Sequence, residues 1–254
     1  MEASRTVLYS VEGSIALVTL NRPEKRNALN EEVVSELKTA LQEADANENL
    51  RAVLLTGAGS DFCSGADLAA LRKISESSII ENLEDAESLM ELFTLVRRVR
   101  VPVVAAVRGR ALAGGGGLAT ACDIVLAARS ARFGYPEVKI GFVPAMVMAI
   151  LRRNVSEKRA FELLTRGGDI DAVEAERIGL INQVCNDDEF ETRVEAYMAG
   201  FERVSRSAVA LSKRLLYGID GMTFESAIRA GADTNAIARM TEDCQKGIKR
   251  FLEK

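Results

Sequence analysis

Apolar and polar positions alternate at the start of the chain, and the pattern then becomes helical. Residues 7–20 alternate around a turn at Gly13, which predicts a β-hairpin. Asn30 is well suited to cap a helix whose apolar side chains recur at helical spacing up to residue 44. The short apolar segment at residues 52–55 predicts a buried strand. Together these elements predict a strand–helix–strand unit behind the hairpin.

The alternation of strands and helices continues to about residue 130. Helical patterns occupy residues 67–74 and 79–96, and apolar segments at 103–107 and 123–127 predict two further strands. A glycine run at residues 114–117 separates the first of these strands from a short, helix-like LATA segment. This order of elements is typical of a mostly parallel α/β core with right-handed crossovers.

The chain changes character after Pro144, where most segments have helical spacing. We therefore expect an α/β core over residues 1–187 and a helical C-terminal region over residues 188–254. The helical region is expected to pack on the core or on a neighbouring subunit. The elements predicted after Pro144 are helices at 145–151, 156–164 and 171–178, a strand at 180–184, and three more helices from residue 188 onward.

The composition is that of a soluble globular protein. The chain has 254 residues, of which 48% are apolar and 28% are charged. Its 33 basic and 37 acidic residues give a net charge of −4 without a long block of either sign, which argues against a nucleic-acid partner. No apolar segment approaches the roughly 18–20 residues that span a bilayer, and the first residues lack a secretory pattern. We expect a cytoplasmic protein without a membrane partner.

The chain contains no histidine, which excludes several kinds of catalytic site. A Ser-His-Asp or Cys-His nucleophile and an HExxH metal site all need that residue. The four cysteines stand far apart without metal-ligand spacing, so we expect neither a metal site nor a disulfide framework. Proton transfer must use Asp, Glu, Lys, Tyr, Cys or bound water.

Two glycine-bearing segments, at residues 62–68 and 109–117, each lie at a strand-to-helix junction. One interpretation is a pair of tight turns, because glycine adopts backbone conformations that other residues avoid. The other uses both segments together. Free N–H groups at two helix N-termini that converge on one point could stabilise a developing oxyanion. Neither segment has the pattern of a phosphate-binding loop or of a dinucleotide fingerprint.

Four segments carry a resemblance to a known family. They are NRPEKRNAL at 21–29, FCSGADL at 62–68, AVRGRALAGGGGLATACD at 106–123 and FGYPE at 133–137. In order and spacing they resemble the crotonase family of enoyl-CoA hydratases and isomerases, over essentially the whole chain. The resemblance implies an α/β fold with a crotonase-type ββα spiral core and a helical C-terminal trimerisation region. It also implies an acyl-CoA thioester as substrate and a homotrimer, often paired into a hexamer.

The same resemblance assigns the catalytic groups. The thioester oxygen would be held by the peptide N–H groups of Ala66 and Gly114, and Glu137 would be the base. Family hydratases carry a second glutamate after the glycine run, where this sequence has Gly117. One carboxylate suffices to move a proton between two carbons, as in the Δ3,Δ2-enoyl-CoA isomerases of the family. A Gly117→Glu substitution is therefore expected to raise hydration relative to isomerisation.

The resemblance also implies which residues bind the substrate. Phe251 and Lys254 match a family tail that reaches the CoA of an adjacent subunit, with an ordinary amphipathic helix end as the alternative. Coenzyme A arrives as part of the substrate, so we expect no separate cofactor. The remaining expected substrate-binding residues are Lys25, Ala28, Ala66, Asp67, Leu68 and Gly114.

Other residues have more than one interpretation. Arg108 and Arg110 could bind a second carboxylate on a dicarboxylic acyl-CoA, or could simply lie at the surface. Tyr135 could donate a hydrogen bond into the pocket or serve in packing. Asp123 is expected to be structural, and Cys63 to be a small apolar filler.

We therefore expect an enzyme that hydrates or isomerises an enoyl-CoA, using an oxyanion hole and a single glutamate base. The alternatives are a non-catalytic acyl-CoA-binding or scaffold member of the family and an acyl-CoA hydrolase. Consumption of a 2-enoyl-CoA or a 3-enoyl-CoA separates an enzyme of this type from a scaffold.

Overall fold

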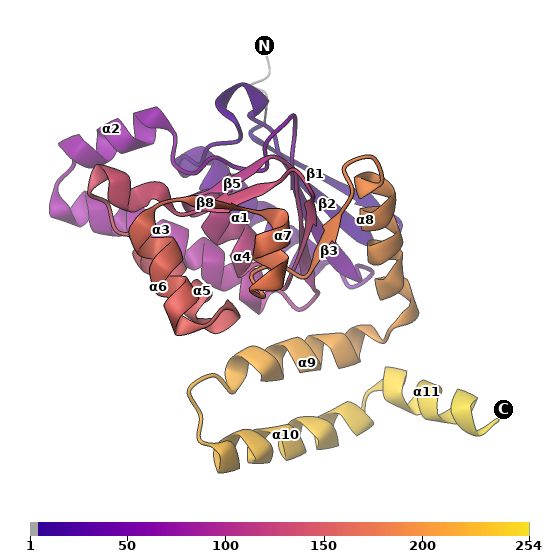
Figure 1. The fold of residues 1–254 in the computed structure, drawn as a ribbon. Coiled ribbons are helices and arrows are strands. Elements are labelled where there is room, and N and C mark those ends of the chain that lie inside the picture. The colour runs from indigo at the N-terminus through magenta and orange to yellow at the C-terminus, as the bar shows by residue number, and fades with distance from the viewer. Residues whose placement is uncertain (1–4, 254) are drawn as a thin grey trace.

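The predicted hairpin starts a six-stranded sheet in the computed structural model, which describes residues 5–253 (Figure 1). The strand order is β1-β2-β3-β4-β6-β9. Only the β1–β2 pair is antiparallel, and every other neighbouring pair is parallel, as the strand–helix alternation predicts. The strands are β1 (Val7–Glu12), β2 (Ile15–Leu20), β3 (Ala52–Gly57), β4 (Val103–Val107), β6 (Ile124–Ala128) and β9 (Gln183–Cys185).

A second, three-stranded sheet has the order β5-β7-β8, with β5 (Arg110–Leu112), β7 (Arg132–Gly134) and β8 (Asp169–Asp171). The β5–β7 pair is parallel and the β7–β8 pair antiparallel. These strands were not predicted, because three residues are too short to show a period of two. They matter for function, since β5 leads into the glycine run and β7 into the FGYPE segment.

Both faces of the large sheet are buried at its centre, whereas most of the edge strand β1 is exposed. All five residues of β4 are buried, and they alternate between two apolar clusters on opposite faces. The larger cluster holds side chains of α1, α3 and α4, and the smaller one is closed by Phe190, Val194 and Met198 of α8. The helices before the C-terminal region are α1 (Glu31–Ala46), α2 (Leu68–Glu76), α3 (Ile79–Arg98), α4 (Gly114–Ala121), α5 (Ala145–Asn154), α6 (Glu157–Arg166) and α7 (Ala172–Arg177).

The structure corrects the prediction for the glycine run. Residues 114–117 are not a separating loop but the first turn of α4. Glycine normally disfavours a helix, yet here a Cβ atom at Gly115 would lie 2.4 Å from the carbonyl oxygen of Cys63. The absence of side chains lets this helix approach its neighbours closely, so packing overrides local propensity.

The strand predicted at 180–184 is shorter and lies later, at Gln183–Cys185, because only these residues pair with β6. The C-terminal region contains four α-helices within the described residues, not three. Ser205, Thr223 and Thr241 each cap a new helix with a side-chain oxygen, which divides the segment. The four are α8 (Phe190–Ala199), α9 (Arg206–Gly218), α10 (Phe224–Arg239) and α11 (Glu242–Leu252), and none of the described helices is long and apolar enough to cross a membrane.

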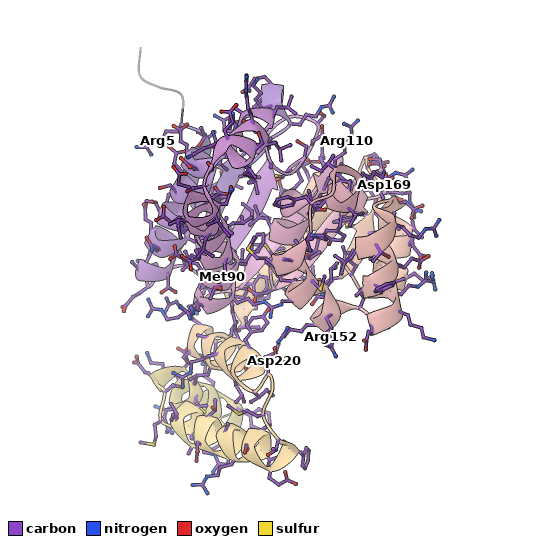
Figure 2. All side chains as sticks on the ribbon, turned by 90° about the vertical axis from the view of Figure 1, so that its left-hand side faces the viewer. Arg5, Met90, Arg110, Arg152, Asp169 and Asp220 are labelled. Carbon is purple, nitrogen blue, oxygen red and sulfur yellow. The ribbon has the colours of Figure 1, made fainter. Side chains whose placement is uncertain are left out.

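The helices α9, α10 and α11 extend away from the rest of the molecule, whereas α8 packs on the sheet (Figures 1 and 2). We call α9, α10 and α11 together the arm. A buried ion pair joins the arm to the core. Lys213 of α9 donates a 2.7 Å hydrogen bond to Asp123, and Tyr217 donates one of 2.7 Å to the other oxygen of the same carboxylate. Asp123 is therefore structural, as predicted from its position at a strand start.

Candidate active site

Ala66 and Gly114 lie at corresponding positions beyond a parallel bridge between Cys63 and Ala111 of β5. Cys63 and Ala111 form a parallel bridge, in which the Cys63 N–H donates to the Arg110 carbonyl at 2.9 Å and Leu112 donates to Cys63 at 3.0 Å. Ala66 lies three residues beyond Cys63, and Gly114 lies three residues beyond Ala111. Because parallel neighbours advance together, this register brings the two expected oxyanion residues to corresponding positions.

Both N–H groups are available to a ligand. Leu29 brackets Ala66, since its N–H donates to the Gly65 carbonyl at 2.7 Å and its carbonyl accepts from Asp67 at 3.0 Å. Within residues 5–253, the Ala66 N–H has no acceptor of its own. Gly114 begins α4, and the first N–H groups of a helix lack intrahelical acceptors. The positive end of the helix dipole adds to the attraction for a developing oxyanion.

Ala113, directly before Gly114, has an unusual backbone conformation. Its φ of +50° and ψ of −127° lie in a region that residues with a side chain rarely adopt. The Ala113 N–H donates a 2.8 Å hydrogen bond to the carbonyl of Gly134, which helps to hold the turn. Strained residues of this kind cluster at functional sites, where the surrounding structure holds them. Here the strained turn sets the direction of the Gly114 N–H.

Glu137 follows the same strand that bonds to Ala113. The residue belongs to a short 3-10 helix (Pro136–Ile140) and lies three residues beyond Gly134. The side chain is half-buried, and its Oε2 is enclosed without a hydrogen-bond partner in the described part of the chain. Burial disfavours the charged form and raises the pKa of Glu137 above its ordinary 4.5. A carboxylate with one enclosed, unpaired oxygen and a raised pKa is suited to accept a proton from a bound substrate.

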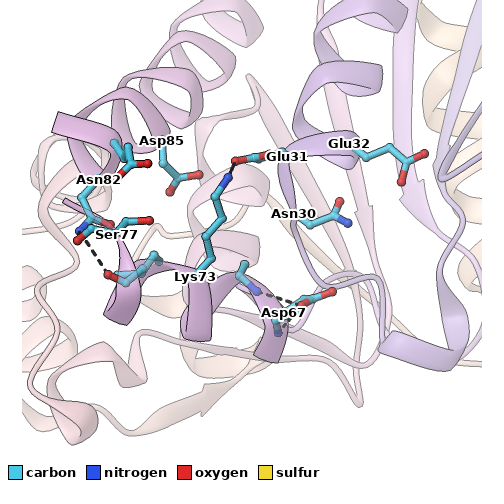
Figure 3. A pocket seen from close by; sticks show the side chains of 12 residues that line it. Asn30, Glu31, Glu32, Asp67, Lys73, Ser77, Asn82 and Asp85 are labelled. Atoms are coloured by element: carbon cyan, nitrogen blue, oxygen red, sulfur yellow. Dashed lines mark hydrogen bonds and ion pairs between the residues drawn. The ribbon is translucent and has the colours of Figure 1, made fainter. Parts of the chain in front are cut away.

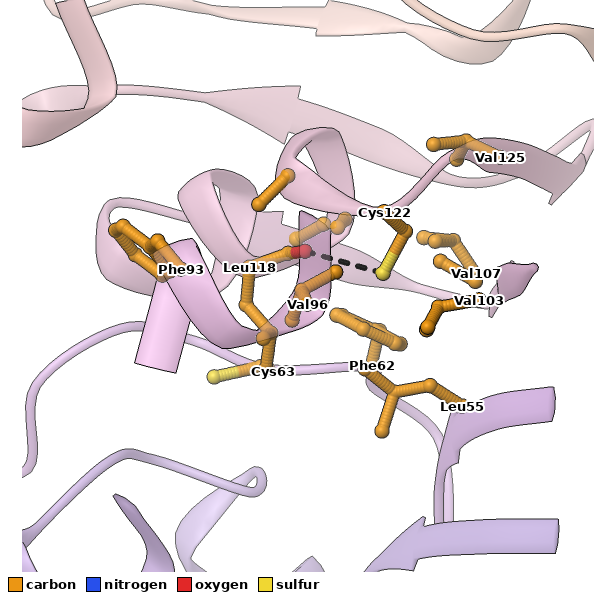
Figure 4. Packing of buried hydrophobic residues seen from close by; sticks show 14 of the residues in the cluster. Leu55, Phe62, Cys63, Phe93, Val96, Val103, Val107, Leu118, Cys122 and Val125 are labelled. Atoms are coloured by element: carbon orange, nitrogen blue, oxygen red, sulfur yellow. Dashed lines mark hydrogen bonds between the residues drawn. The ribbon is translucent and has the colours of Figure 1, made fainter. Parts of the chain in front are cut away.

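The position of the second family glutamate is occupied by hydrocarbon. Gly117 lies in the first turn of α4, and a Cβ atom there would lie 2.7 Å from Val147 of α5 and 3.0 Å from Phe93 of α3. Figure 4 shows Phe93 of α3 beside Leu118, which follows Gly117 in α4. No second carboxylate can therefore enter at this position without a shift of its neighbours.

Cys63 and Tyr135 have packing roles. Cys63 is fully buried, and burial raises the pKa of its thiol to about 12, so it is an apolar filler and not a nucleophile (Figure 4). Tyr135 is likewise fully buried, with its hydroxyl 3.5 Å from the Thr120 hydroxyl, and burial raises its pKa. Its ring packs against the glycine turn, since a Cβ at Gly116 would lie 3.1 Å from the ring.

The two arginines near the oxyanion segment are already paired. Arg108 forms an ion pair with Glu191 and lies over the ring of Phe190 at 4.9 Å. Arg110 faces Asp61 at 3.9 Å. Of the two interpretations offered for these residues, the structure favours the surface one.

Arg22 links two of the expected substrate-binding residues, and its role was not predicted. It donates to the carbonyl of Ala28 at 2.7 Å and forms an ion pair with Asp67 at 2.8 Å. The hydrogen bond from Arg22 holds the pKa of Asp67 below its ordinary value. The only sequence signal was the position of this arginine inside the NRPEKRNAL segment. Its contacts tie that segment to the loop that presents Ala66.

The other expected substrate-binding residues are dispersed. Lys25 ends a short 3-10 helix (Pro23–Lys25) and is exposed, and Leu68 is 85% exposed at the start of α2. Phe251 is 79% exposed on α11, at the far end of the arm from α2 in Figure 1. Lys254 lies outside the described residues. A single chain thus brings Ala28, Ala66, Asp67 and Gly114 together but not Phe251.

A pocket of about 290 Å³ lies beside Asp67, between α1, α2 and α3 (Figure 3). Glu31, one of its acidic lining residues, pairs with Lys73. The carboxylates make this pocket unsuited to the phosphates of CoA. Among the described residues no cluster of acidic, cysteine or histidine side chains could hold a metal ion. The acidic residues of the lining are Glu31, Glu32, Asp67, Glu81 and Asp85.

Comparison with known proteins supports the same assignment. The profile of the family described as enoyl-CoA hydratase/isomerase matches residues 10–254. A Thermus thermophilus protein named as an enoyl-CoA hydratase is 43% identical over 243 residues, covering 96% of each chain. A crotonyl-CoA hydratase of Syntrophomonas wolfei is 33% identical, covering 99% of this chain and 96% of the relative.

The fold matches that of solved enoyl-CoA hydratase structures. The crystal structure of an enoyl-CoA hydratase from Mycobacterium smegmatis superposes with a TM-score of 0.94 at 32% identity, covering 98% of this chain and 97% of the other. The prediction of a crotonase-type spiral core with C-terminal helices is confirmed by this match. The chain belongs to the enoyl-CoA hydratase/isomerase family, also called the crotonase family.

Proposed function

We propose that this enzyme acts on an enoyl-CoA thioester with Glu137 as its only carboxylate base, and that it moves the double bond of the acyl group. The observation that carries the proposal is the half-buried Glu137 carboxylate, whose Oε2 is enclosed without a hydrogen-bond partner in the described part of the chain, on the segment that bonds to the oxyanion turn. Family membership supports the acyl-CoA substrate class. The chemistry requires no further cofactor, because CoA is part of the substrate.

The oxyanion site lowers the barrier to proton removal. Deprotonation beside a thioester carbonyl places negative charge on its oxygen, and the N–H groups of Ala66 and Gly114 are oriented to receive it. One such donor is typically worth about 3–4 kcal/mol of transition-state stabilisation. The two donors therefore make the carbon beside the thioester acidic enough for a carboxylate to deprotonate it.

A single carboxylate then suffices for a 1,3-proton shift. Glu137 takes a proton from C2 of a 3-enoyl-CoA, the electrons move into a dienolate held at the oxyanion site, and the protonated carboxyl returns the proton to C4. The C3–C4 double bond is lost and a C2–C3 double bond forms, so atoms and charge balance. Because one group both removes and returns the proton, transfer takes place on one face of the acyl group.

Hydration is the second candidate, because several relatives are named hydratases. Adding water across the C2–C3 bond requires one group to deprotonate the water near C3 and another to protonate C2. Gly117 offers no side chain for either role. In a hydratase reaction, Glu137 and bound water would therefore have to fill both roles.

The test is to incubate the protein with a 3-enoyl-CoA and with a 2-enoyl-CoA of the same chain length and to separate the products by chromatography. We expect faster conversion of the 3-enoyl-CoA, and a loss of about 10²–10⁴-fold in the Glu137→Gln variant, because an amide cannot accept the proton. The exposed Glu157→Gln variant is the matched control. Equal rates for Glu137→Gln and wild type contradict the proposal, and binding without turnover of either substrate indicates a scaffold.

We also propose that the protein is a trimer or a hexamer. The arm exposes large apolar side chains, among them Phe224, Ile228 and Met240 of α9–α11 and their connections. Exposed apolar surface of this kind marks association sites. In such an assembly Phe251 would reach a neighbouring subunit, which supplies what a single chain does not bring together.

A further inference from the structure

Gly117 differs from the two preceding glycines in what surrounds it. At Gly115 and Gly116 the nearest atoms to an added Cβ include the carbonyl oxygens of Cys63 and Ala111, which cannot move without the backbone. At Gly117 all three nearest atoms belong to side chains: Val147 Cγ2 at 2.7 Å, and Phe93 Cζ and Cε2 at 3.0 and 3.3 Å. The space beside Gly117 is thus closed only by hydrocarbon side chains.

Val147 and Phe93 form a dry wall along this side of α4. Their residual exposures are 4% and 5%, and both belong to the main apolar cluster. A water molecule held there would lack the two to four polar partners that a buried water requires. The wall therefore fills the space that a side chain at position 117 would need and offers no polar partner to a water molecule there.

The two wall residues differ in their freedom to move. Phe93 also borders a cleft of about 840 Å³ between α3, α5 and α9, so its ring has space on the far side. Val147 does not line that cleft, and its β-branched side chain is restricted in rotation. Val147 also makes the closest approach to the Gly117 position. It is therefore the residue whose removal opens this space.

We infer that Val147, supported by Phe93, determines the reaction specificity of the site by filling the volume that a second acid–base group and its water would need. This inference rests on the proposed single-base chemistry. With the wall in place, a proton held by Glu137 can only return to carbon. With the wall opened and a carboxylate supplied at 117, water can be held at C3: its oxygen bonds to C3, one of its protons passes to a carboxylate, and C2 receives a proton.

The experiment compares Gly117→Glu, Val147→Ala and the double variant, with Gly117→Glu/Ile150→Ala as a matched control on the same helix. Ile150 is buried in α5 but is not among the atoms nearest to Gly117. We expect Gly117→Glu alone to lower Tm without raising hydration of a 2-enoyl-CoA. This corrects the expectation from the sequence that the substitution raises hydration, because Val147 and Phe93 leave no room for the new side chain. The Gly117→Glu/Val147→Ala variant should regain Tm and raise the ratio of hydration to isomerisation by about a hundredfold, the usual effect of one acid–base group.

Two results overturn the inference. One is a Gly117→Glu protein that is as stable as wild type and hydrates without help from Val147→Ala. The other is a folded double variant that still isomerises but gains no hydration. If wild type itself fails to isomerise a 3-enoyl-CoA, the proposed function fails instead, and the two failures are distinguished.

A smaller substitution covers the case in which glutamate prevents folding. Alanine is favoured over glycine inside a helix, so Gly117→Ala should be stabilising wherever there is room for it. We expect it to lower Tm in wild type and to raise Tm in the Val147→Ala background. The same sign in both backgrounds contradicts the assignment of Val147 as the closing residue.

Discussion

Gly65 and Ala113 lie so close that a Cβ atom added to Gly65 would be 2.8 Å from the Cβ of Ala113. Gly65 has a φ of +94° and Ala113 a φ of +50°, so both are in the left-handed half of conformational space. They directly precede Ala66 and Gly114, the two residues whose N–H groups we propose to bind the thioester oxygen. The contact between them therefore sets the relative position of the two donors.

Gly65→Ala should damage both stability and catalysis. The substitution adds backbone strain and a collision with Ala113, which pushes the two donors apart. Because loss of one oxyanion donor costs about 10²–10³-fold in kcat, we expect a decrease of that order with a lower Tm. Gly221→Ala is the control, since Gly221 has a φ of +82° but nothing within 4 Å of its added Cβ. A Gly65→Ala enzyme with the activity of the Gly221→Ala enzyme would contradict this role.

On acidification, activity should begin to fall at a higher pH than it would with a glutamate of ordinary pKa as the base. Burial raises the pKa of Glu137 above 4.5, and the base works only when deprotonated. We expect kcat/KM to decline as pH falls through this raised pKa. A pH profile that declines only below 4.5, or the same acid limb in the residual activity of Glu137→Gln, would argue against Glu137 as the titrating base.

The same shift has a consequence for stability. The folded pKa of Glu137 lies above the unfolded one, so the folded state binds more protons between them and stability rises as pH falls through the folded pKa. Above the folded-state pKa, the buried charge lowers the free energy of unfolding by its full amount. Below the unfolded-state pKa, Glu137 is neutral in both states and this cost is absent. Glu137→Gln should raise Tm at pH 8 and have less effect near pH 4, measured by calorimetry. The exposed Glu157→Gln variant is the matched control.

Lys213→Met should strongly destabilise the protein. It removes the ammonium that bonds to Asp123 at 2.7 Å and to the carbonyls of Val96 and Val101 at 2.9 and 3.0 Å. The Asp123 carboxylate would stay buried without its cation, which typically costs about 3–5 kcal/mol. Urea unfolding measures the loss. The exposed pair of Arg229 and Asp233 is the control, and Arg229→Ala should cost no more than about 1 kcal/mol.

Tyr135→Phe tests the packing role of this residue. The hydroxyl faces Thr120 inside the core, so we expect activity within a few-fold of wild type. The lost hydrogen bond should cost about 0.5–1.5 kcal/mol in the free energy of unfolding. A large fall in kcat with unchanged stability would instead show that the hydroxyl contacts the substrate.

Deletion of residues 249–254 tests the proposed role of the tail across the subunit interface. We expect weaker binding of acyl-CoA, measured by calorimetry, with sedimentation of the same oligomer as the full chain. A truncated oligomer that binds acyl-CoA as tightly as the full chain would exclude the cross-subunit role. A full-length protein that sediments as a monomer would exclude the oligomer.

The elements that the sequence predicted are those with a local signal. The hairpin of β1 and β2, the cap at Asn30 and the buried strand β4 each follow from residues adjacent in the chain, because periodicity and capping are short-range effects. The position of Glu137 and the absence of a carboxylate at Gly117 were also visible in the sequence itself. These features determined the fold class and the candidate base.

Tertiary structure decided the rest, because those features depend on contacts between distant segments. The strands β5, β7 and β8 exist only because they pair with one another. The glycine run forms a helix despite its low helix propensity, because this helix packs so closely on Cys63 and Tyr135 that no side chain would fit. The link from Arg22 to Asp67 spans two loops. The wall beside Gly117 comes from two helices remote in sequence, Phe93 on α3 and Val147 on α5. No local pattern reports on such a contact, because close packing between remote side chains is settled only when the chain is folded.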